Sequence, residues 1–245
     1  MSEAVTVKAP AKLTLNLRVM GVRADGYHFI DAEMISVDLF DELRVEAGSG
    51  LDVVEAGSGL TVPTGADNLI TRALQLLGVS ASVRVDKNIP AGAGLGGGSS
   101  DAAAILRWGG FTDEVAASAL GADVAFCLVG GRARVSGIGE LVEPLMHVPR
   151  RFTLLIPPFG VSTPEVYRRW DDLGGPSGTA GNDLEPAALA LMPELVLWRD
   201  ALGMATGVQP HLAGSGGTWF VEGAFDGVRY QGVKAINVQA LSAHG

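Results

Sequence analysis

The feature that most constrains the fold of this chain is a glycine-rich run in its middle. Five of the seven residues from Gly92 to Gly98 are glycines, and two serines and an aspartate follow them. The alternating segment Ser82–Asp86 before the run predicts a strand, and the alanine-rich segment Ala102–Trp108 after it predicts a helix. The sequence therefore predicts a glycine loop that joins a strand to the start of a helix.

A glycine loop at the start of a helix is suited to bind a phosphate group. Its backbone N–H groups can approach an anion closely because no Cβ atoms intervene, and the helix N-terminus adds its positive dipole end. We expect Ser99, Ser100 or Asp101 to be the N-cap of this helix. Glycine richness alone is equally compatible with a tight or flexible turn that binds nothing.

Two familiar phosphate-binding patterns fit the loop poorly. A Walker A loop has Gly-Lys-Ser or Gly-Lys-Thr before its helix, whereas Ser99 follows Gly98 directly. A dinucleotide-binding fingerprint can be forced onto residues 92–97, but this run does not follow the first strand of a regular strand–helix alternation. We therefore expect neither a P-loop nor a Rossmann fold.

The rest of the chain mixes strand and helix patterns without an internal repeat. Alternating residues over most of the first 47 positions predict strands, and short apolar pieces among the glycines of residues 48–65 predict an edge hairpin. Further patterns predict helices at 68–77, 164–170 and 184–202 and a strand at 152–156. This mixture predicts an α+β fold rather than a regular βαβ series.

The composition restricts the class of protein and its partners. A chain of 245 residues, 47% of them hydrophobic, can bury a large core. The single cysteine, Cys127, allows no internal disulfide, so we expect a reducing, cytoplasmic compartment. The formal net charge of −9 argues against nucleic-acid binding, and no apolar stretch is long enough to cross a membrane. We expect a soluble protein, a monomer or a homodimer, whose partner is a small molecule.

Several segments together resemble one known family. The run from Pro90 to Ala103 resembles the ATP-phosphate loop of GHMP kinases, named for galactokinase, homoserine, mevalonate and phosphomevalonate kinases. Three further segments, in the expected order, are similar to the 4-diphosphocytidyl-2-C-methyl-D-erythritol kinase branch, and a fourth resembles its C-terminal glycine motif. These four segments are Ala9–Leu13, Arg23–His28, Leu120–Phe126 and Gly214–Thr218.

The resemblance implies a two-domain α+β GHMP kinase fold with the active site between the domains. We expect a ribosomal protein S5 domain 2-like domain at residues 1–145 and a ferredoxin-like domain at residues 146–245. The implied reaction transfers the γ-phosphoryl group of ATP, with Mg²⁺, to the 2-hydroxyl of 4-diphosphocytidyl-2-C-methyl-D-erythritol in the non-mevalonate isoprenoid pathway. The alternatives are another GHMP small-molecule kinase and a relative that binds nucleotides without catalysis.

Asp123 and Lys12 match the family's catalytic pair. Asp123 would accept the proton of the 2-hydroxyl, while the Lys12 cation would keep Asp123 ionised and favour the developing alkoxide. Taken alone, Asp123 is better explained as a helix cap and Lys12 as a solvated strand residue. The joint order of the motifs favours the catalytic interpretation.

The resemblance assigns ATP to the glycine loop and to neighbouring positions. Backbone N–H groups from Gly94 to Ser100 would hold the triphosphate, and the hydroxyls of Ser99 and Ser100 would touch the phosphates of Mg-ATP. Asn68 and Lys87 would contact adenosine, and the alternative for Lys87 is a merely exposed lysine. No protein residue is assigned as a metal ligand. The nucleotide set is Asn68, Lys87, Pro90, Gly92, Gly94, Leu95, Gly96, Gly97, Gly98, Ser99 and Ser100.

Tyr27 and His28 match the pair that recognises cytosine, with the tyrosine ring stacked on the base and the histidine at its polar edge. In isolation, a turn aromatic followed by a surface histidine would explain this pair better. Tyr167 resembles a second aromatic that sandwiches the base, and helix packing explains it about equally well. Thr14 stands where the family usually has Asn, with Asn16 nearby, which predicts an altered hydrogen bond to the substrate.

Overall fold

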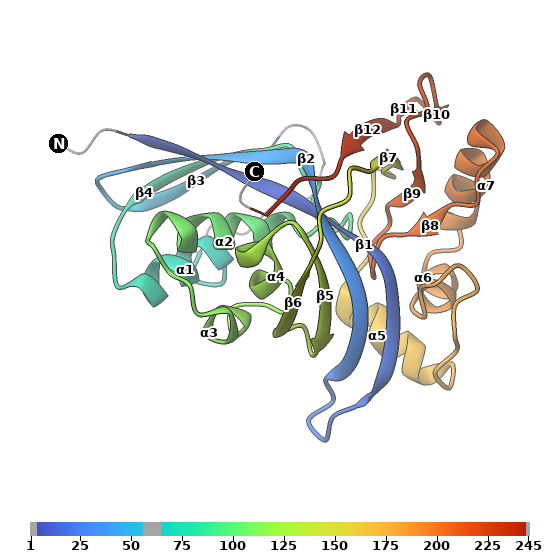
Figure 1. The fold of residues 1–245 in the computed structure, drawn as a ribbon, viewed down its shortest axis with the longest axis horizontal. Helices are drawn as coiled ribbons and strands as arrows, with labels where there is room; N and C mark the ends of the chain where they lie inside the picture. Colours follow the sequence, from blue (N-terminus) through green and yellow to red (C-terminus); the bar gives the residue numbers. More distant parts are fainter. Residues whose placement is uncertain (1–3, 56–64, 244–245) are drawn as a thin grey trace.

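The described residues, 4–55 and 65–243, form two larger β-sheets with helices packed against them and a separate two-stranded hairpin in the computed structural model (Figure 1). Within these residues, a six-stranded sheet is built from the chain up to residue 145, and a four-stranded sheet from residues 151–239. The predicted α+β class is confirmed. No helix in the described residues is long and apolar enough to cross a membrane.

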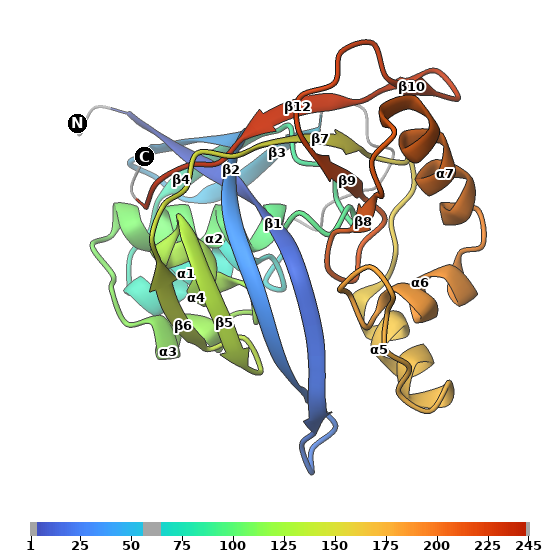
Figure 2. The ribbon, with the colours of Figure 1, turned by 45° about the vertical axis from the view of Figure 1, so that its right-hand side comes forward.

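Two long strands dominate the larger sheet. β1 (Val5–Val22) and β2 (His28–Glu46) pair antiparallel along their whole length, and their hairpin projects from the rest of the molecule (Figures 1 and 2). The pairing shifts register between Pro10 and Ala11 and again between Thr14 and Asn16. Bulges bend a strand and re-aim its side chains. The segment from Ala11 to Thr14 therefore has an irregularity in strand pairing at each of its ends.

The opposite edge of β2 carries two partners, one after the other. β4 (Ser82–Lys87) pairs antiparallel with its second half, and β5 (Arg132–Gly137) with its first half. β6 (Leu141–Leu145) is antiparallel to β5. β3 (Gly50–Glu55) lies at the predicted edge, but its partner is the parallel strand β4. The second half of the hairpin predicted at 48–65 lies outside the described residues.

Four helices pack beside this sheet in the described part of the first 145 residues. They are α1 (Leu69–Leu77), α2 (Gly97–Trp108), α3 (Glu114–Ser118) and α4 (Val124–Val129). α2 packs against β1, α1 and α4, and every residue from Ser100 to Leu106 is buried. Its small alanine side chains allow this close approach on several sides. The start of α2, which follows the glycine loop, is therefore held firmly against β1.

The smaller sheet has the strand order β12-β7-β9-β8, with antiparallel neighbours throughout. Its strands are β7 (Arg151–Leu155), β8 (His211–Leu212), β9 (Trp219–Glu222) and β12 (Ile236–Gln239), and β10 (Arg229–Tyr230) and β11 (Val233–Lys234) form a separate hairpin. The helices are α5 (Thr163–Asp172), α6 (Glu185–Leu191) and α7 (Leu195–Thr206). The continuous helical pattern predicted at 184–202 is thus interrupted near Pro193, because proline lacks an N–H and clashes with the preceding turn.

The two sheets are joined by a shared core and by backbone contacts. One hydrophobic cluster includes Leu17 of β1 and Trp219 of β9. The N–H of Leu17 donates to the carbonyl of Gly181 at 2.9 Å, and Leu241 donates to Ser36 at 2.9 Å. Since the packing across the sheets is continuous, the domain division at residue 145 stays a prediction.

Candidate active site

Two adjoining cavities share part of their lining. The hairpin cavity, about 590 Å³, is lined by β1, β2, the turn between them, and α5. The loop cavity, about 400 Å³, is lined by the glycine loop and the end of β4. Five residues line both cavities: Lys12, Ser99, Asp123, Thr163 and Ser215. Both members of the predicted catalytic pair therefore lie at the boundary between the two cavities.

The predicted pair forms an ion pair in the structure. Lys12 Nζ lies 3.1 Å from Asp123 Oδ2, with the lysine side chain 7% exposed and the aspartate side chain 31% exposed. Asp123 occupies the N-cap position of α4 but makes no capping hydrogen bond with its side chain. Lys12 is buried and also donates to Thr14 Oγ1 at 3.2 Å. Neither a helix cap nor a solvated strand residue describes what these side chains do.

The glycine loop lies directly against the stem of Lys12. The backbone N–H of Lys12 donates to the carbonyl of Leu95 at 2.9 Å. Gly96 has φ +69°, and a Cβ atom there would lie 2.6 Å from Lys12 Cγ. Both the backbone conformation and the close approach require glycine at this position. The loop and the side chain of Lys12 are therefore packed together as one unit.

The helix after the loop begins earlier than the sequence predicted. Gly96 is the N-cap of α2, and Gly97 and Gly98 are already helical. The expectation that Ser99, Ser100 or Asp101 would cap the helix is wrong, because these residues lie inside its first turns. No side chain caps the helix start, so the first N–H groups of α2 remain available to an anion in the loop cavity.

Ten of the eleven predicted nucleotide residues line the loop cavity. Ser100 is the exception, since its hydroxyl is buried and donates to the carbonyl of Pro10 at 2.6 Å. Asn68 lines the cavity and also caps α1, where its Oδ1 accepts from the N–H of Ile70 at 2.8 Å. The Ser100 hydroxyl thus attaches α2 to β1 instead of facing the cavity.

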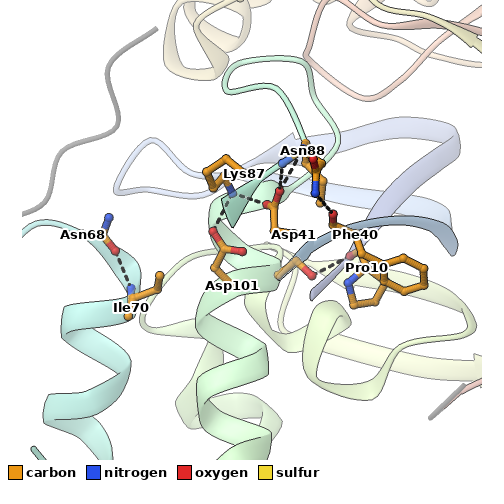
Figure 3. Close-up of polar contacts among 10 residues, drawn as sticks. Pro10, Phe40, Asp41, Asn68, Ile70, Lys87, Asn88 and Asp101 are labelled. Atoms are coloured by element: carbon orange, nitrogen blue, oxygen red, sulfur yellow. Dashed lines mark hydrogen bonds and ion pairs between the residues drawn. The ribbon is translucent and has the colours of Figure 1, made fainter. Parts of the chain in front are cut away.

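Lys87 is buried in a charge cluster (Figure 3). Its Nζ donates to Asp101 Oδ2 at 2.6 Å and to Asp41 Oδ2, and only 8% of the residue is exposed. Asp41 Oδ1 also accepts from the N–H groups of Asn88 at 2.6 Å and Ile89 at 2.8 Å. The alternative that Lys87 is merely exposed is wrong. The cluster secures the chain where it enters the glycine loop.

Aromatic side chains gather in the hairpin cavity, which all four predicted substrate residues line. The rings of His28 and Tyr167 have centroids 4.7 Å apart, and His28 Nε2 lies 2.8 Å from Asp171 Oδ1. The His28 side chain is 7% exposed, so it is not a surface histidine, whereas Tyr27 is 58% exposed. Burial, together with the charge of Asp123, raises the pKa of Tyr167, which keeps its hydroxyl neutral.

Sequence reasoning gave no role to several residues that shape the site. Asp171 and Trp170 hold the His28 ring from α5, and Asp41 and Asp101 hold Lys87. Asn182 donates to the carbonyls of Leu212 and Gly214 at 2.9 and 2.7 Å. These partners are distant in sequence, and no local pattern marks them. Among the described residues, no group of three His, Cys, Asp or Glu side chains is placed to hold a metal ion.

Comparison with known proteins places this fold and loop in a class. Residues 68–131 match the family model described as the GHMP kinases N terminal domain. A homoserine kinase from Cytophaga hutchinsonii superposes with a TM-score of 0.60 over 99% of this chain and 96% of its own, and at 19% identity this likeness concerns the fold alone. The loop, the fold and the family model together define a GHMP kinase, a class that uses ATP.

More similar relatives narrow the class. A 4-diphosphocytidyl-2-C-methyl-D-erythritol kinase from Paracoccus denitrificans is 37% identical, over 86% of this chain and 84% of its own. A crystal structure of a 4-(cytidine 5'-diphospho)-2C-methyl-D-erythritol kinase superposes with a TM-score of 0.75 at 31% identity, over 98% of this chain and 100% of its own. The chain belongs to the 4-diphosphocytidyl-2-C-methyl-D-erythritol kinase family. The predicted family and GHMP kinase fold are confirmed.

Proposed function

We propose that the chain transfers the γ-phosphoryl group of ATP to the 2-hydroxyl of 4-diphosphocytidyl-2-C-methyl-D-erythritol. The observation that carries this proposal is the position of the Lys12–Asp123 pair, which lines both cavities. A cavity with an anion-binding loop on one side and a cavity with aromatic rings on the other suit a phosphate donor and a nucleotide-linked acceptor. Phosphoryl transfer needs these two substrates to meet at one point.

On the donor side, the backbone N–H groups of the glycine loop and of the first turn of α2 would hold the triphosphate. Lys12 places its ammonium at the edge of the same cavity, 3.1 Å from Asp123. The described residues offer no group of three His, Cys, Asp or Glu side chains for a metal, so Mg²⁺ would be held mainly by phosphate oxygens and water. When bound, the ion would supply neutralisation of the phosphate charge.

In the transfer step, Asp123 accepts the proton of the acceptor hydroxyl as the oxygen of that hydroxyl forms its bond to the γ-phosphorus. The bond between the γ-phosphorus and the bridging oxygen breaks, and ADP leaves with that electron pair. The Lys12 ammonium stabilises negative charge at this point, and Thr14 Oγ1 fixes its direction through the 3.2 Å hydrogen bond.

On the acceptor side, we assign the cytosine to the aromatic cluster of the hairpin cavity. Tyr167 and His28 form a fixed wall, and Asp171, one turn after Tyr167 on α5, holds the histidine ring through its Nε2. The exposed ring of Tyr27 at the turn of the hairpin offers a second stacking surface. A nucleobase between aromatic rings keeps a polar edge for hydrogen bonds, which suits the histidine.

The test measures ADP release by the purified protein with Mg-ATP and 4-diphosphocytidyl-2-C-methyl-D-erythritol, mevalonate, homoserine or no acceptor. We expect turnover with the cytidine compound only, and a loss of about 10²- to 10⁴-fold in kcat for Asp123→Asn. Glu143→Gln, which removes an exposed carboxylate of β6, is the matched control and should keep full activity. Turnover with another acceptor would indicate a different GHMP kinase, and nucleotide binding without turnover would indicate a noncatalytic relative.

A further inference from the structure

Three charged side chains are buried together beneath the glycine loop. Asp41, Lys87 and Asp101 are 0%, 8% and 3% exposed, and the single ammonium of Lys87 contacts both carboxyl groups. If both carboxyl groups were ionised, this cluster would carry one net negative charge. A net charge in a buried site is costly, because neither water nor a counterion offsets it.

The two carboxyl groups of the cluster are not satisfied equally. Asp41 accepts hydrogen bonds at both oxygens, from two backbone N–H groups and from Lys87. Asp101 accepts only from Lys87 at Oδ2, and its buried Oδ1 has no partner within the described residues. Asp101 is therefore the member that gains most from binding a proton. In agreement, burial and the charge of Asp41 raise the pKa of Asp101 to about 7, against the opposing charge of Lys87.

This cluster adjoins the place assigned to the triphosphate. Lys87 and Asp101 both line the loop cavity together with the glycines of the loop. Lys87 Nζ lies 3.2 Å from the position that a Cβ atom at Gly97 would take. A polyanion on the first turn of α2 therefore lies close to the charges of the cluster, with little water between them to screen the interaction.

Other charged or titratable groups on the elements around α2 are engaged elsewhere. Arg107 of α2 donates to the carbonyl of Cys127, and Arg72 of α1 donates to the carbonyls of residues 119 and 120. Lys12 of β1 pairs with Asp123 at the start of α4, and the thiol of Cys127 is buried in α4. None of these side chains is hydrogen-bonded to Asp101, so Asp41 and Lys87 set its environment.

We propose that Asp101 is a proton-linked positioning residue for the nucleotide: the protein binds the nucleotide with Asp101 neutral and takes up a proton from solvent when it does so. Once Asp101 carries the proton, Lys87 and Asp41 remain as an ion pair with no net charge. The cluster then has no negative charge that would repel the phosphates. The same pair continues to hold the chain where it enters the glycine loop. This inference rests on the nucleotide site of the proposed function.

The test is calorimetric titration of Mg-ADP into the full-length protein in buffers that differ in ionisation enthalpy. We expect proton uptake of up to about half a proton per site near pH 7, since a group with a pKa of about 7 is half protonated there. If the nucleotide raises that pKa by about one unit, the Kd increases about sixfold between pH 6.5 and 8.5. Asp101→Asn, which imitates the neutral form, should bind Mg-ADP without the uptake and with a flatter pH profile. Glu143→Gln should behave like the wild type.

Asp41→Asn is a second variant, which keeps the inference testable if Asp101→Asn does not fold. It leaves Lys87 and Asp101 as a balanced pair, so it should also lose the proton uptake. Steady-state kinetics give an independent readout. The substitutions should change the pH dependence of the KM for ATP and leave the pH dependence of kcat unchanged. Wild-type binding without proton uptake, or an uptake that persists in both variants, would overturn the inference alone. Absence of any Mg-ADP binding by the wild type would overturn the nucleotide site as well.

Discussion

Gly94 and Gly98 lie four residues apart in the loop, yet we expect their replacement by alanine to have opposite effects on stability. Gly94 has φ +82°, and a Cβ atom there would lie 2.5 Å from the carbonyl oxygen of Ala213 and 2.7 Å from Gly216 Cα. These are backbone atoms of the C-terminal glycine motif and of the residue before it, and they cannot rotate away as a side chain could. Gly94 is thus the point at which the two glycine motifs meet.

The cost of Gly94→Ala has two parts. A residue with a Cβ atom in the left-handed region costs about 1–2 kcal/mol, and relief of the clash with fixed backbone costs about 1–3 kcal/mol more. The free energy of unfolding should therefore fall by roughly 2–5 kcal/mol, a large part of the stability of a typical domain. At Gly98 a Cβ atom would meet only Leu69 Cδ1, at 3.8 Å. Because Gly98 is helical, Gly98→Ala should gain up to about 1 kcal/mol.

Urea denaturation followed by circular dichroism measures both changes, and Mg-ADP titration measures the affinity. Gly98 is exposed and lines the loop cavity, so its methyl group should weaken nucleotide binding while the fold is kept. Gly94→Ala should instead lower the denaturation midpoint by far the larger amount. Gly94→Ala as stable as the wild type, or Gly98→Ala as destabilised as Gly94→Ala, would refute the reasoning. Gly94 would then not be needed for close packing, or Gly98 would not serve only to keep the cavity open to phosphate.

Three further predictions concern the lysine, the interface and the thiol. Thr14→Val removes the acceptor of Lys12 Nζ. It should lower kcat by at least about tenfold, because a hydrogen bond to a charged group contributes about 1.5–3 kcal/mol and about 1.4 kcal/mol corresponds to tenfold in rate. Thr14→Ser should retain activity, and equal rates for the two variants would contradict the role of this hydrogen bond. Asn182→Ala leaves the buried carbonyls of Leu212 and Gly214 without their donor and should cost about 2–4 kcal/mol in urea denaturation, an expectation that an unchanged midpoint would refute. Burial raises the pKa of Cys127 to about 12, so a thiol reagent at pH 8 should react only after unfolding, and rapid reaction of the native protein would show that the thiol is accessible.

Local patterns were sufficient for the strand before the glycine loop and for the helix after Asn68. The alternating residues before the loop became β4, and the apolar spacing after Asn68 became α1 with Asn68 as its N-cap. The pairing of Lys12 with Asp123 followed from matched motifs rather than from periodicity. The pairing of the edge strand was harder to predict from the sequence. The partner of β3 is β4, which follows an intervening helix, and strand pairing across such a separation depends on the whole sheet.

The buried charge cluster shows why the rest of the site could not be derived from local sequence. The antiparallel register of β2 and β4 pairs Glu42 with Asp86. This register places Asp41 beside Lys87. A sequence pattern gives no such register, so Lys87 was interpreted as a nucleotide contact or an exposed lysine. Asp101 was one of three candidates for the N-cap at the end of the loop, but α2 begins at Gly97 and places it inside the helix, 3% exposed. A shift of one turn in a helix start thus converts a solvated cap into a buried carboxyl group, whose charge must be balanced before a phosphate can bind beside it.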